Sequence, residues 1–285
     1  MIIFKETAPL TAHLEKLRSA GKTVGFVPTM GALHDGHLSL IRKSKAETEV
    51  TVCSIFVNPT QFNDPKDFEK YPVTTEKDIE LLRKENTDVL FLPVIGEIYS
   101  DNIIADQHYD LGYLETILEG EHRPGHFQGV CQVVHRLLHI VQPRILFLGQ
   151  KDFQQCMVLK KLVQLVSSPV IIRLGETIRE QSGLAMSSRN MRLTNEQKQQ
   201  ATAIYRSLIS IKENYPGKTP YTLKQQAISN LLNAGFEKVD YVEIAKADSL
   251  EPIGDNEILS ASTPAVGLIA AFIGGVRLID NMILT

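Results

Sequence analysis

Residues 27–41, VPTMGALHDGHLSLI, combine two glycines with two histidines in one short stretch. The run before them is typical of a buried strand and the run after them of a helix beginning near Gly36. Gly31 and Gly36 let the backbone approach a ligand, and the N–H groups at a helix start attract anions. His34 and His37 are three residues apart, so both can face the same phosphate. We interpret the stretch as a site where two imidazoles stabilise charge as a phosphoanhydride breaks.

Two other interpretations of this stretch stay open from its residues alone. A histidine at a helix start often caps the helix or lies in solvent, and His-x-x-His can also hold a metal. The dinucleotide fingerprint Gly-x-Gly-x-x-Gly is absent.

Two further segments carry side chains suited to small ligands. Asn58 and Gln61, in FVNPTQFN, follow a buried strand, and their amides can both donate to and accept from a hydroxy acid. Asn-Pro also forms plain turns, which is the alternative. In GQKDFQQ a strand delivers Lys151 and Asp152 to a helix start, either as a second anion site with a metal-facing carboxylate or as a solvated pair.

Three other polar segments allow a structural and a functional interpretation. MSSRN, at residues 186–190, could clamp the outer phosphates of ATP or form a serine-rich surface loop. EGEHRPGHF, at residues 119–127, is either a helix-connecting loop or one that covers a substrate. His135 and His139 have zinc-ligand spacing, but Arg136 stands where a zinc protease needs glutamate, so we assign them to the polar face of a helix.

Strand and helix patterns alternate through residues 1–176. The predicted strands are residues 23–27, 50–57, 89–92, 144–149 and 170–174. The predicted helices are residues 10–20, a helix from about 36, and residues 76–86, 111–119, 127–141 and 152–166. Such alternation predicts an α/β fold with a doubly wound parallel sheet, in which ligands bind beyond the carboxyl ends of the strands. Residues 28–37, 58–71 and 149–152 would converge there.

Residues 177–285 have a different pattern. Two helices are predicted at residues 195–214 and 219–234, followed by strands at residues 238–244, 265–272 and 276–282. Gly274-Gly275 between the last two strands is a hairpin signal. We therefore expect a Rossmann-like domain over residues 1–176 and a smaller α+β domain over residues 177–285.

The composition is that of a globular chain: 285 residues, 43% hydrophobic and 22% charged. The formal net charge of −3 gives no basic field for nucleic acid. No stretch reaches the ~18 apolar residues of a membrane span, and the N-terminus lacks signal or transit character, so we expect a cytoplasmic protein that binds no membrane. Cys53, Cys131 and Cys156 are widely spaced in apolar segments, which predicts buried reduced thiols.

Six motifs in this order span nearly the whole chain: PTMGALHDGH, FVNPTQFN, YP at Tyr71, EGEHRPGHF, GQKDFQQ and GLAMSSRN. Together they closely resemble the pantoate–β-alanine ligase family, within the nucleotidylyltransferase superfamily. The resemblance implies a Rossmann-like domain that binds nucleotide and pantoate, a C-terminal lid domain, ATP as co-substrate, Mg²⁺ and a homodimer. It also implies a reaction in two steps, in which pantoate is adenylated with release of pyrophosphate and β-alanine then displaces AMP.

The resemblance further implies roles for individual residues. His34, His37 and Lys151 would be catalytic, acting on the phosphates. ATP would contact Met30, Gly31, Ala32, Leu33, His34, Asp35, Gly36, His37, Gly149, Gln150, Lys151, Asp152, Ile178, Met186, Ser187, Ser188 and Arg189. The other substrates would contact Gln61 and Gln155, and the site would also be lined by Asn58, Tyr71, Glu119 and Arg123. Leu148, Gln150 and Phe153 depart from the residues most frequent in the family.

Two other functions fit part of the pattern. A nucleotidyltransferase acting on a phosphorylated acceptor would share the first motif, but it would need basic residues where this chain has neutral Gln61 and Gln155. A non-catalytic nucleotide-binding regulator could dispense with the histidines, Lys151 and the MSSRN segment. All of these are present here.

Overall fold

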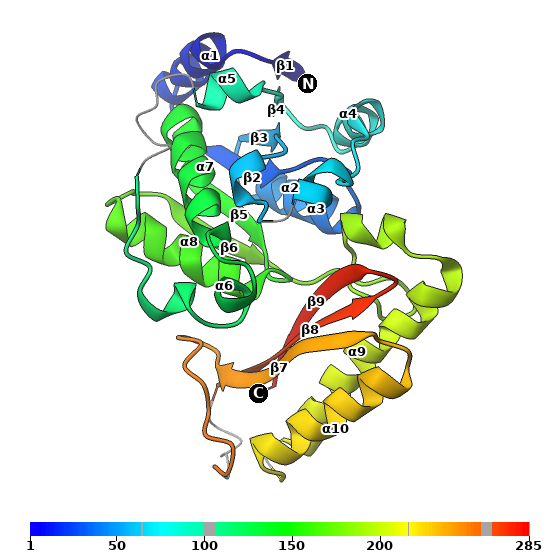
Figure 1. Ribbon diagram of the computed structural model, residues 1–285. Helices are drawn as coiled ribbons and strands as arrows, with labels where there is room; N and C mark the ends of the chain where they lie inside the picture. Colours follow the sequence, from blue (N-terminus) through cyan, green and yellow to red (C-terminus); the bar gives the residue numbers. More distant parts are fainter. Residues whose placement is uncertain (64, 100–106, 216, 258–263, 285) are drawn as a thin grey trace. The chain divides into compact units, whose positions relative to one another are not determined.

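The computed structural model describes residues 1–63, 65–99, 107–215, 217–257 and 264–284. The chain divides into two compact units, which are described separately below (Figure 1). The first comprises Met1–Gln150 and Gln155–Glu176, and the second comprises Lys151–Gln154 and Thr177–Thr285. The predicted division at residue 176 differs from these units in one segment, Lys151–Gln154. The domain functions attached to that division stay predictions.

The first unit contains a six-stranded parallel sheet in the order β1-β4-β3-β2-β5-β6. Its strands are β1 Ile2–Phe4, β2 Val24–Thr29, β3 Val50–Ile55, β4 Val89–Phe91, β5 Ile145–Gly149 and β6 Ile171–Gly175. The chain winds outward from β2 through β3 and β4, and then resumes on the other side of β2 with β5 and β6. This reversal confirms the doubly wound α/β prediction and places a topological switch point between β2 and β5. The carboxyl ends of β3, β2 and β5 are therefore neighbours, as expected.

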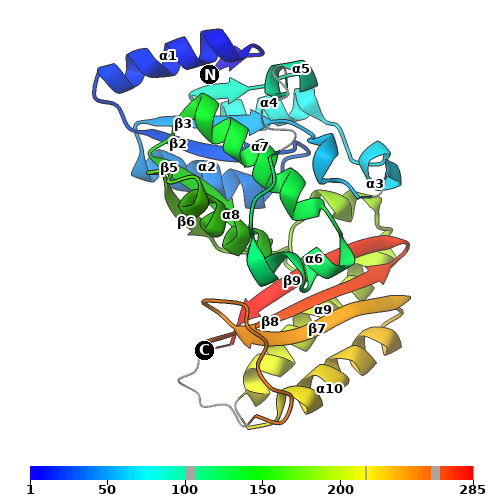
Figure 2. The same ribbon diagram turned by 60° about the vertical axis from the view of Figure 1, so that its left-hand side comes forward.

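Helices lie on both faces of the sheet. The helices before Glu176 are α1 Thr7–Ser19, α2 Asp35–Glu47, α3 Pro65–Glu69, α4 Thr75–Lys84, α5 Ile95–Ile98, α6 Glu119–His122, α7 His126–Val141 and α8 Phe153–Leu165, with 3₁₀ turns η1 Pro59–Gln61 and η2 Gly112–Glu115. Helix α2 packs against β2, β3 and β5, whereas α7 lies on the opposite face (Figures 1 and 2). Val27, Ile41, Cys53, Leu90 and Phe147 form part of the buried core between sheet and helices.

The structure of the first unit departs from the sequence prediction at one strand and at one helix. Strand β1 was not predicted, because three mostly exposed residues at a sheet edge carry too little pattern. The predicted helix over residues 111–119 is wrong, since the chain forms η2 and then the short α6. Leu118 between them has a φ of 49°, which a helix cannot accommodate. A Cβ at Gly120 would lie 2.2 Å from the Glu115 carbonyl oxygen, so the chain folds back on itself here.

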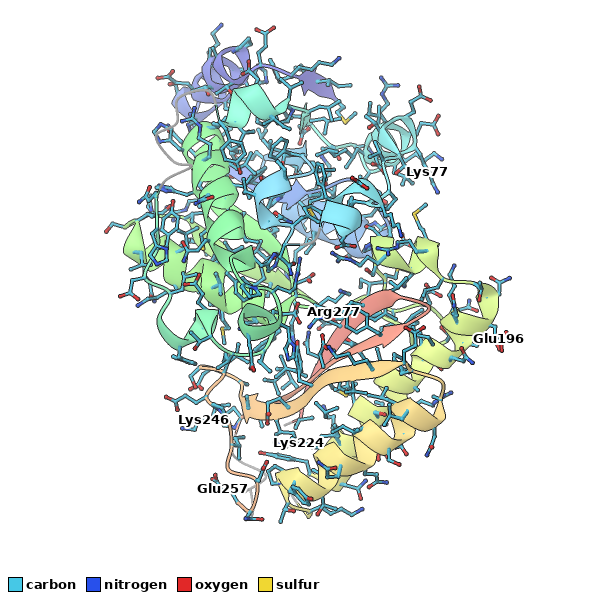
Figure 3. All side chains as sticks on the ribbon, viewed as in Figure 1. Lys77, Glu196, Lys224, Lys246, Glu257 and Arg277 are labelled. Carbon is cyan, nitrogen blue, oxygen red and sulfur yellow. The ribbon has the colours of Figure 1, made fainter. Side chains whose placement is uncertain are left out.

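The second unit consists of a three-stranded antiparallel sheet and two long helices. Its elements are η3 Ser188–Arg192, α9 Asn195–Asn214, α10 Pro220–Asn233, β7 Lys238–Lys246, β8 Ala265–Ile273 and β9 Val276–Ile283, with the strand order β7-β8-β9. Gly274 and Gly275 have φ values of 58° and 67°, which confirms the predicted tight hairpin. Lys224 of α10, labelled in Figure 3, forms ion pairs with Glu243 of β7 at 3.0 Å and with Asp255 at 2.5 Å.

Candidate active site

The two histidines of the first motif are fixed by the start of α2. His34 is the N-cap residue, and its Nδ1 accepts a hydrogen bond from the Gly36 N–H at 3.2 Å. His37 Nδ1 accepts from the His34 N–H at 3.3 Å. An Nδ1 that accepts must leave the ring hydrogen of a neutral imidazole on Nε2. The ring centroids lie 4.1 Å apart, and each neutral ring carries its hydrogen on Nε2.

The loop before α2 has an unusual backbone. Gly31 and Ala32 have φ values of 82° and 48°, so two successive residues are left-handed. The turn directs the consecutive backbone N–H groups of Ala32 and Leu33 at one anion. Here the anion is the protein's own carboxylate, because Asp78 accepts from the Ala32 N–H at 2.9 Å and from the Leu33 N–H at 2.8 Å. These two donors are thus bonded within the protein, and the contact of ATP with residues 30–37 stays a prediction.

Asp78 is a residue that the sequence analysis did not single out. It lies in the first turn of α4, is 1% exposed, and also accepts a hydrogen bond from the Thr74 hydroxyl at 3.0 Å. A signal was present in the sequence, since Asp78 stands four residues before the buried Leu82 and so shares the apolar face of its helix. A carboxylate on such a face needs hydrogen-bond donors.

Gln61 lies in the turn that follows β3. Its Nε2 donates to the sulfur of Met30 at 2.8 Å, and its Oε1 accepts from Asn58 Nδ2 at 3.4 Å. Asn58 is 1% exposed and also donates to the Gly129 carbonyl at 3.1 Å, while its Oδ1 accepts from the Tyr99 hydroxyl at 2.6 Å. Three predicted site residues, Met30, Asn58 and Gln61, are thus brought together at the ends of β2 and β3.

A chain of buried and half-buried polar groups joins α6 and α7 to this turn. Glu119 and Arg123 form an ion pair at 3.6 Å, and Arg123 donates to His126 Nε2 at 3.1 Å. His126 Nδ1 in turn donates to the Gln61 carbonyl at 2.7 Å. Predicted residues Glu119 and Arg123 are therefore connected to Gln61 through His126, a residue of the EGEHRPGHF motif that had no assigned role. Tyr71 is buried, with its ring edge-on to Phe62 at 5.7 Å.

The remaining predicted residues of the first unit lie around the end of β5. Gly149 pairs with Gly175, and the Gln150 N–H donates to the Gly175 carbonyl at 2.8 Å. Gln155 is half-buried in the first turns of α8. Lys151 and Asp152, which follow directly in the chain, belong to the second unit.

The other residues predicted to contact ATP belong to the second unit. The Lys151 Nζ atom lies 3.9 Å from Asp152 Oδ1. The Lys151 carbonyl accepts a hydrogen bond from Asn281 Nδ2 at 2.7 Å. The Met186 N–H donates to the Ile178 carbonyl at 2.9 Å. The Ser187 hydroxyl caps η3 by accepting from the Arg189 N–H at 3.3 Å, and Ser188 is buried. The MSSRN segment is therefore a structured turn here.

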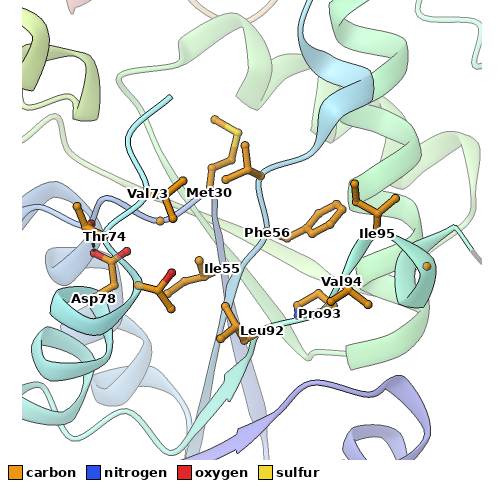
Figure 4. A pocket seen from close by; sticks show the side chains of 14 residues that line it. Met30, Ile55, Phe56, Val73, Thr74, Asp78, Leu92, Pro93, Val94 and Ile95 are labelled. Carbon is orange, nitrogen blue, oxygen red and sulfur yellow. Dashed lines mark hydrogen bonds between the residues drawn. The ribbon is translucent and has the colours of Figure 1, made fainter. Parts of the chain in front are cut away.

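A pocket of about 570 Å³ lies in the first unit, beside the loop that contains Met30 and Gly31 (Figure 4). Its walls are mostly apolar and come from the ends of β3 and β4 and the start of α5, including Ile55, Phe56 and Leu92. Of the predicted site residues, only Met30 and Gly31 line it. The predicted polar groups therefore do not converge in this pocket.

Burial governs the shifted pKa values near these residues. It raises the pKa of Tyr99, although hydrogen bonds with Thr60 and Asn58 oppose the shift. Burial also lowers the pKa of His135, whose Nδ1 is 2.7 Å from the Tyr109 hydroxyl. Among the residues described here, no group of three or more His, Cys, Asp or Glu side chains could hold a metal ion, so His135 and His139 form no such site with a third ligand.

Comparisons with known proteins agree over the full chain. The family model described as Pantoate-beta-alanine ligase matches residues 2–283. A pantothenate synthetase from Cytophaga hutchinsonii is 46% identical over 286 residues, covering 100% of this chain and 99% of that one. A pantothenate synthetase from Thermotoga neapolitana is 44% identical over 289 residues, covering 100% of both chains.

Solved structures are similar to both units. The crystal structure of pantothenate synthetase from Thermus thermophilus has a TM-score of 0.91 at 36% identity, covering 100% of this chain and 99% of that chain. A pantoate-beta-alanine ligase from Francisella tularensis, complexed with beta-gamma ATP and beta-alanine, has a TM-score of 0.81 at 36% identity, covering 100% and 98%. Within the described residues, we find no helix long and apolar enough to cross a membrane.

Proposed function

Because the chain belongs to the pantoate-beta-alanine ligase family, we propose that it joins pantoate to β-alanine at the expense of ATP. In the first step a pantoate carboxylate oxygen attacks the α-phosphorus, and the bond to pyrophosphate breaks. In the second step the β-alanine amine attacks the acyl carbon, AMP leaves with the shared oxygen, and the amine loses a proton. The product is the amide pantothenate.

The histidine pair is the observation that carries the first step. The acceptor roles of both Nδ1 atoms leave Nε2–H groups as donors, and neutral donors held by a helix start suit the negative charge that develops on a transferring phosphoryl group. His34 and His37 therefore act as stabilisers of that charge. Lys151, Ser187, Ser188 and Arg189 supply the cation and hydroxyl groups for the outer phosphates.

The amides of Gln61 and Gln155 suit pantoate, which offers hydroxyl groups and a carboxylate. Gln61 is held by hydrogen bonds to Met30 and Asn58 and through its carbonyl to His126, so its amide group is oriented before substrate arrives. A preoriented neutral amide can bind the hydroxy acid without adding a charge that would oppose adenylation.

Mg²⁺ is expected to accompany ATP. In such sites Mg²⁺ is usually bound by one or two carboxylates together with the substrate phosphates, so it needs no cage made only of protein groups. The Asp152 side chain is 48% exposed beside Lys151, and its carboxylate fits this role. When bound, Mg²⁺ neutralises phosphate charge. Activity should disappear with EDTA and return with excess Mg²⁺.

Two further properties are part of the proposal. We expect a homodimer, which light scattering on a sizing column would test. We also expect a cytoplasmic protein. Cys53, Cys131 and Cys156 are buried, and none forms a disulfide among the described residues, which fits a reducing compartment.

The decisive experiment measures pyrophosphate and AMP separately. With ATP and pantoate alone, pyrophosphate should appear in an amount close to that of the enzyme, since the adenylate stays bound. Adding β-alanine should start continuous AMP release and pantothenate formation. Sustained AMP release without β-alanine, or transfer of AMP to a phosphorylated acceptor, would contradict the proposal and favour a nucleotidyltransferase.

A further inference from the structure

Two adjacent residues of β9 link separate segments of the second unit. Asn281 is 4% exposed, and its Nδ2 donates to the carbonyl of Lys151 at 2.7 Å, across 130 positions of sequence. The preceding residue, Asp280, is 5% exposed and accepts the backbone N–H of Asn281 at 2.8 Å. The peptide of Lys151 is therefore bonded to the sheet of the second unit.

Asp280 also forms an ion pair with Arg179. The Nη1 and Nη2 atoms of Arg179 lie 2.5 and 3.0 Å from the two carboxylate oxygens, in the planar fork arrangement that guanidinium groups favour. Burial raises the pKa of Asp280, while the Arg179 charge and hydrogen bonds oppose that shift. We take Asp280 as ionised at neutral pH, because both of its oxygens face the guanidinium.

Arg179 extends this linkage to the MSSRN segment. Its guanidinium donates to the Gly183 carbonyl at 3.1 Å and lies over the Tyr205 ring, with the Cζ atom 4.3 Å from the centroid. Arg179 and Ala185 pair as a β-bridge, which closes residues 179–185 into a turn directly before Met186. One cluster, formed by half-buried Arg179 with buried Asp280 and Asn281, thus bonds both the Lys151 peptide and the turn that leads to Ser187–Arg189.

We propose that Asn281 is a positioning residue for Lys151 and that the Arg179–Asp280 pair orients Asn281 for this task. The proposal rests on the function proposed above, in which Lys151 contacts the phosphates during adenylation. A lysine side chain is long and flexible, so its ammonium is well placed only when its backbone is fixed. The Asn281 hydrogen bond fixes that backbone relative to the segment that carries Ser187 and Arg189.

The test measures the two chemical steps separately in Asn281→Ala. Pyrophosphate release from ATP and pantoate at saturating ATP should fall about tenfold, the scale of one lost hydrogen bond. Pantothenate formation from supplied pantoyl adenylate should stay within about twofold, because that step no longer involves the outer phosphates. Asn281→Leu keeps a side chain of similar shape but has no donor and no charge, so it should show the same split even if Asn281→Ala fails to fold.

A matched control and a double-mutant cycle separate positioning from general damage. Asn214 also donates its amide to a backbone carbonyl, that of Ser210 at 2.8 Å within α9, so Asn214→Ala should leave both steps unchanged. If Asn281 acts through Lys151, adding Asn281→Ala to Lys151→Ala should change pyrophosphate release by less than about twofold further.

The possible outcomes separate the positioning role of Asn281 from the proposed function. Equal loss in both steps, or additive losses in the double variant, would overturn the positioning role. Unchanged pyrophosphate release in a folded Asn281→Leu variant would do the same while leaving the proposed function intact. A wild-type protein that releases no pyrophosphate with pantoate would instead refute the proposed function.

Discussion

His34 and His37 show how local backbone bonding can set the chemistry of a side chain. Each Nδ1 accepts from a backbone N–H at the start of α2, that of Gly36 or of the N-cap His34, so each ring hydrogen lies on Nε2. A histidine elsewhere on a helix has no such constraint and can adopt either tautomer. The His-x-x-His spacing at this helix start therefore yields two donors, as a charge-stabilising site requires.

The first prediction concerns His37. His37→Ala should lower pyrophosphate release by a factor on the order of 10²–10³, the scale for one preorganised donor to a developing charge. His139→Ala, which removes an exposed histidine from α7, serves as the control and should be neutral. Near-normal pyrophosphate release from a folded His37→Ala protein would show that His37 is not such a donor.

The second prediction concerns Asp78. In Asp78→Asn the amide NH₂ group would face the N–H of Ala32 or of Leu33. Two hydrogen-bond donors would then oppose each other at a buried position, and one hydrogen bond would be lost. We expect a loss of unfolding free energy of about 1–3 kcal/mol, measured by urea denaturation, together with slower adenylation. Glu80→Gln changes an exposed carboxylate of the same helix and should alter neither quantity. Equal stability of the two variants would mean that Asp78 does not hold the loop.

At the scale of elements, the packing of α7 against η1 decides where Gln61 lies. Gly129 allows close contact, because a Cβ there would come within 2.3 Å of the Thr60 carbonyl oxygen. His126 and the Gly129 carbonyl bond the same turn, to Gln61 and Asn58 respectively. The helix thus holds the turn through one steric and two polar contacts.

The third prediction follows from this contact. Gly129→Ala should push the η1 turn away from α7 and raise the KM for pantoate more than the KM for ATP, since Gln61 is displaced while α2 is not. Gly96→Ala is the matched control, because a Cβ at Gly96 meets nothing within 4 Å. Steady-state kinetics with each substrate varied in turn provide the measurement, and a parallel rise in both constants would argue against a local effect.

At the scale of the whole molecule, all three cysteines belong to the first unit and none to the second. Burial raises the pKa of both Cys53 and Cys131 to about 12, from an ordinary value of 9.0. Their thiolate forms are therefore scarce at about pH 8 in the folded protein, and the sulfur atoms are also shielded from reagents. Thiol reactivity should report unfolding of the first unit.

The fourth prediction uses thiol reactivity as a measure of unfolding. At about pH 8, Cys53 and Cys131 should resist iodoacetamide in the native protein and react fully in concentrated urea, with labelled peptides counted by mass spectrometry. Stabilisation of the native state by ATP should slow labelling further at intermediate urea. Rapid native-state labelling of Cys53 would contradict the burial on which the pKa shift depends.

The sequence by itself determined the order and type of most elements. The apolar run that became β3 and the alternation around it predicted a parallel sheet, because strand and helix periodicities are local properties of the chain. The bounds of α9 agree with the prediction of residues 195–214, since Thr194 and Gln197 form a capping box at its start. The motifs also identified the family, because residue types and spacing are read directly from the chain.

Only the tertiary structure decided which groups those elements bond. Asp78 meets the loop of Ala32 and Leu33 across 46 and 45 positions, and Asn281 meets Lys151 across 130. The break at Leu118 likewise accompanies a close approach of Gly120 to Glu115 that helical periodicity did not reveal. Local patterns determine which face of an element is apolar, whereas a buried polar group is satisfied by whichever partner the packing of distant elements brings within hydrogen-bonding distance.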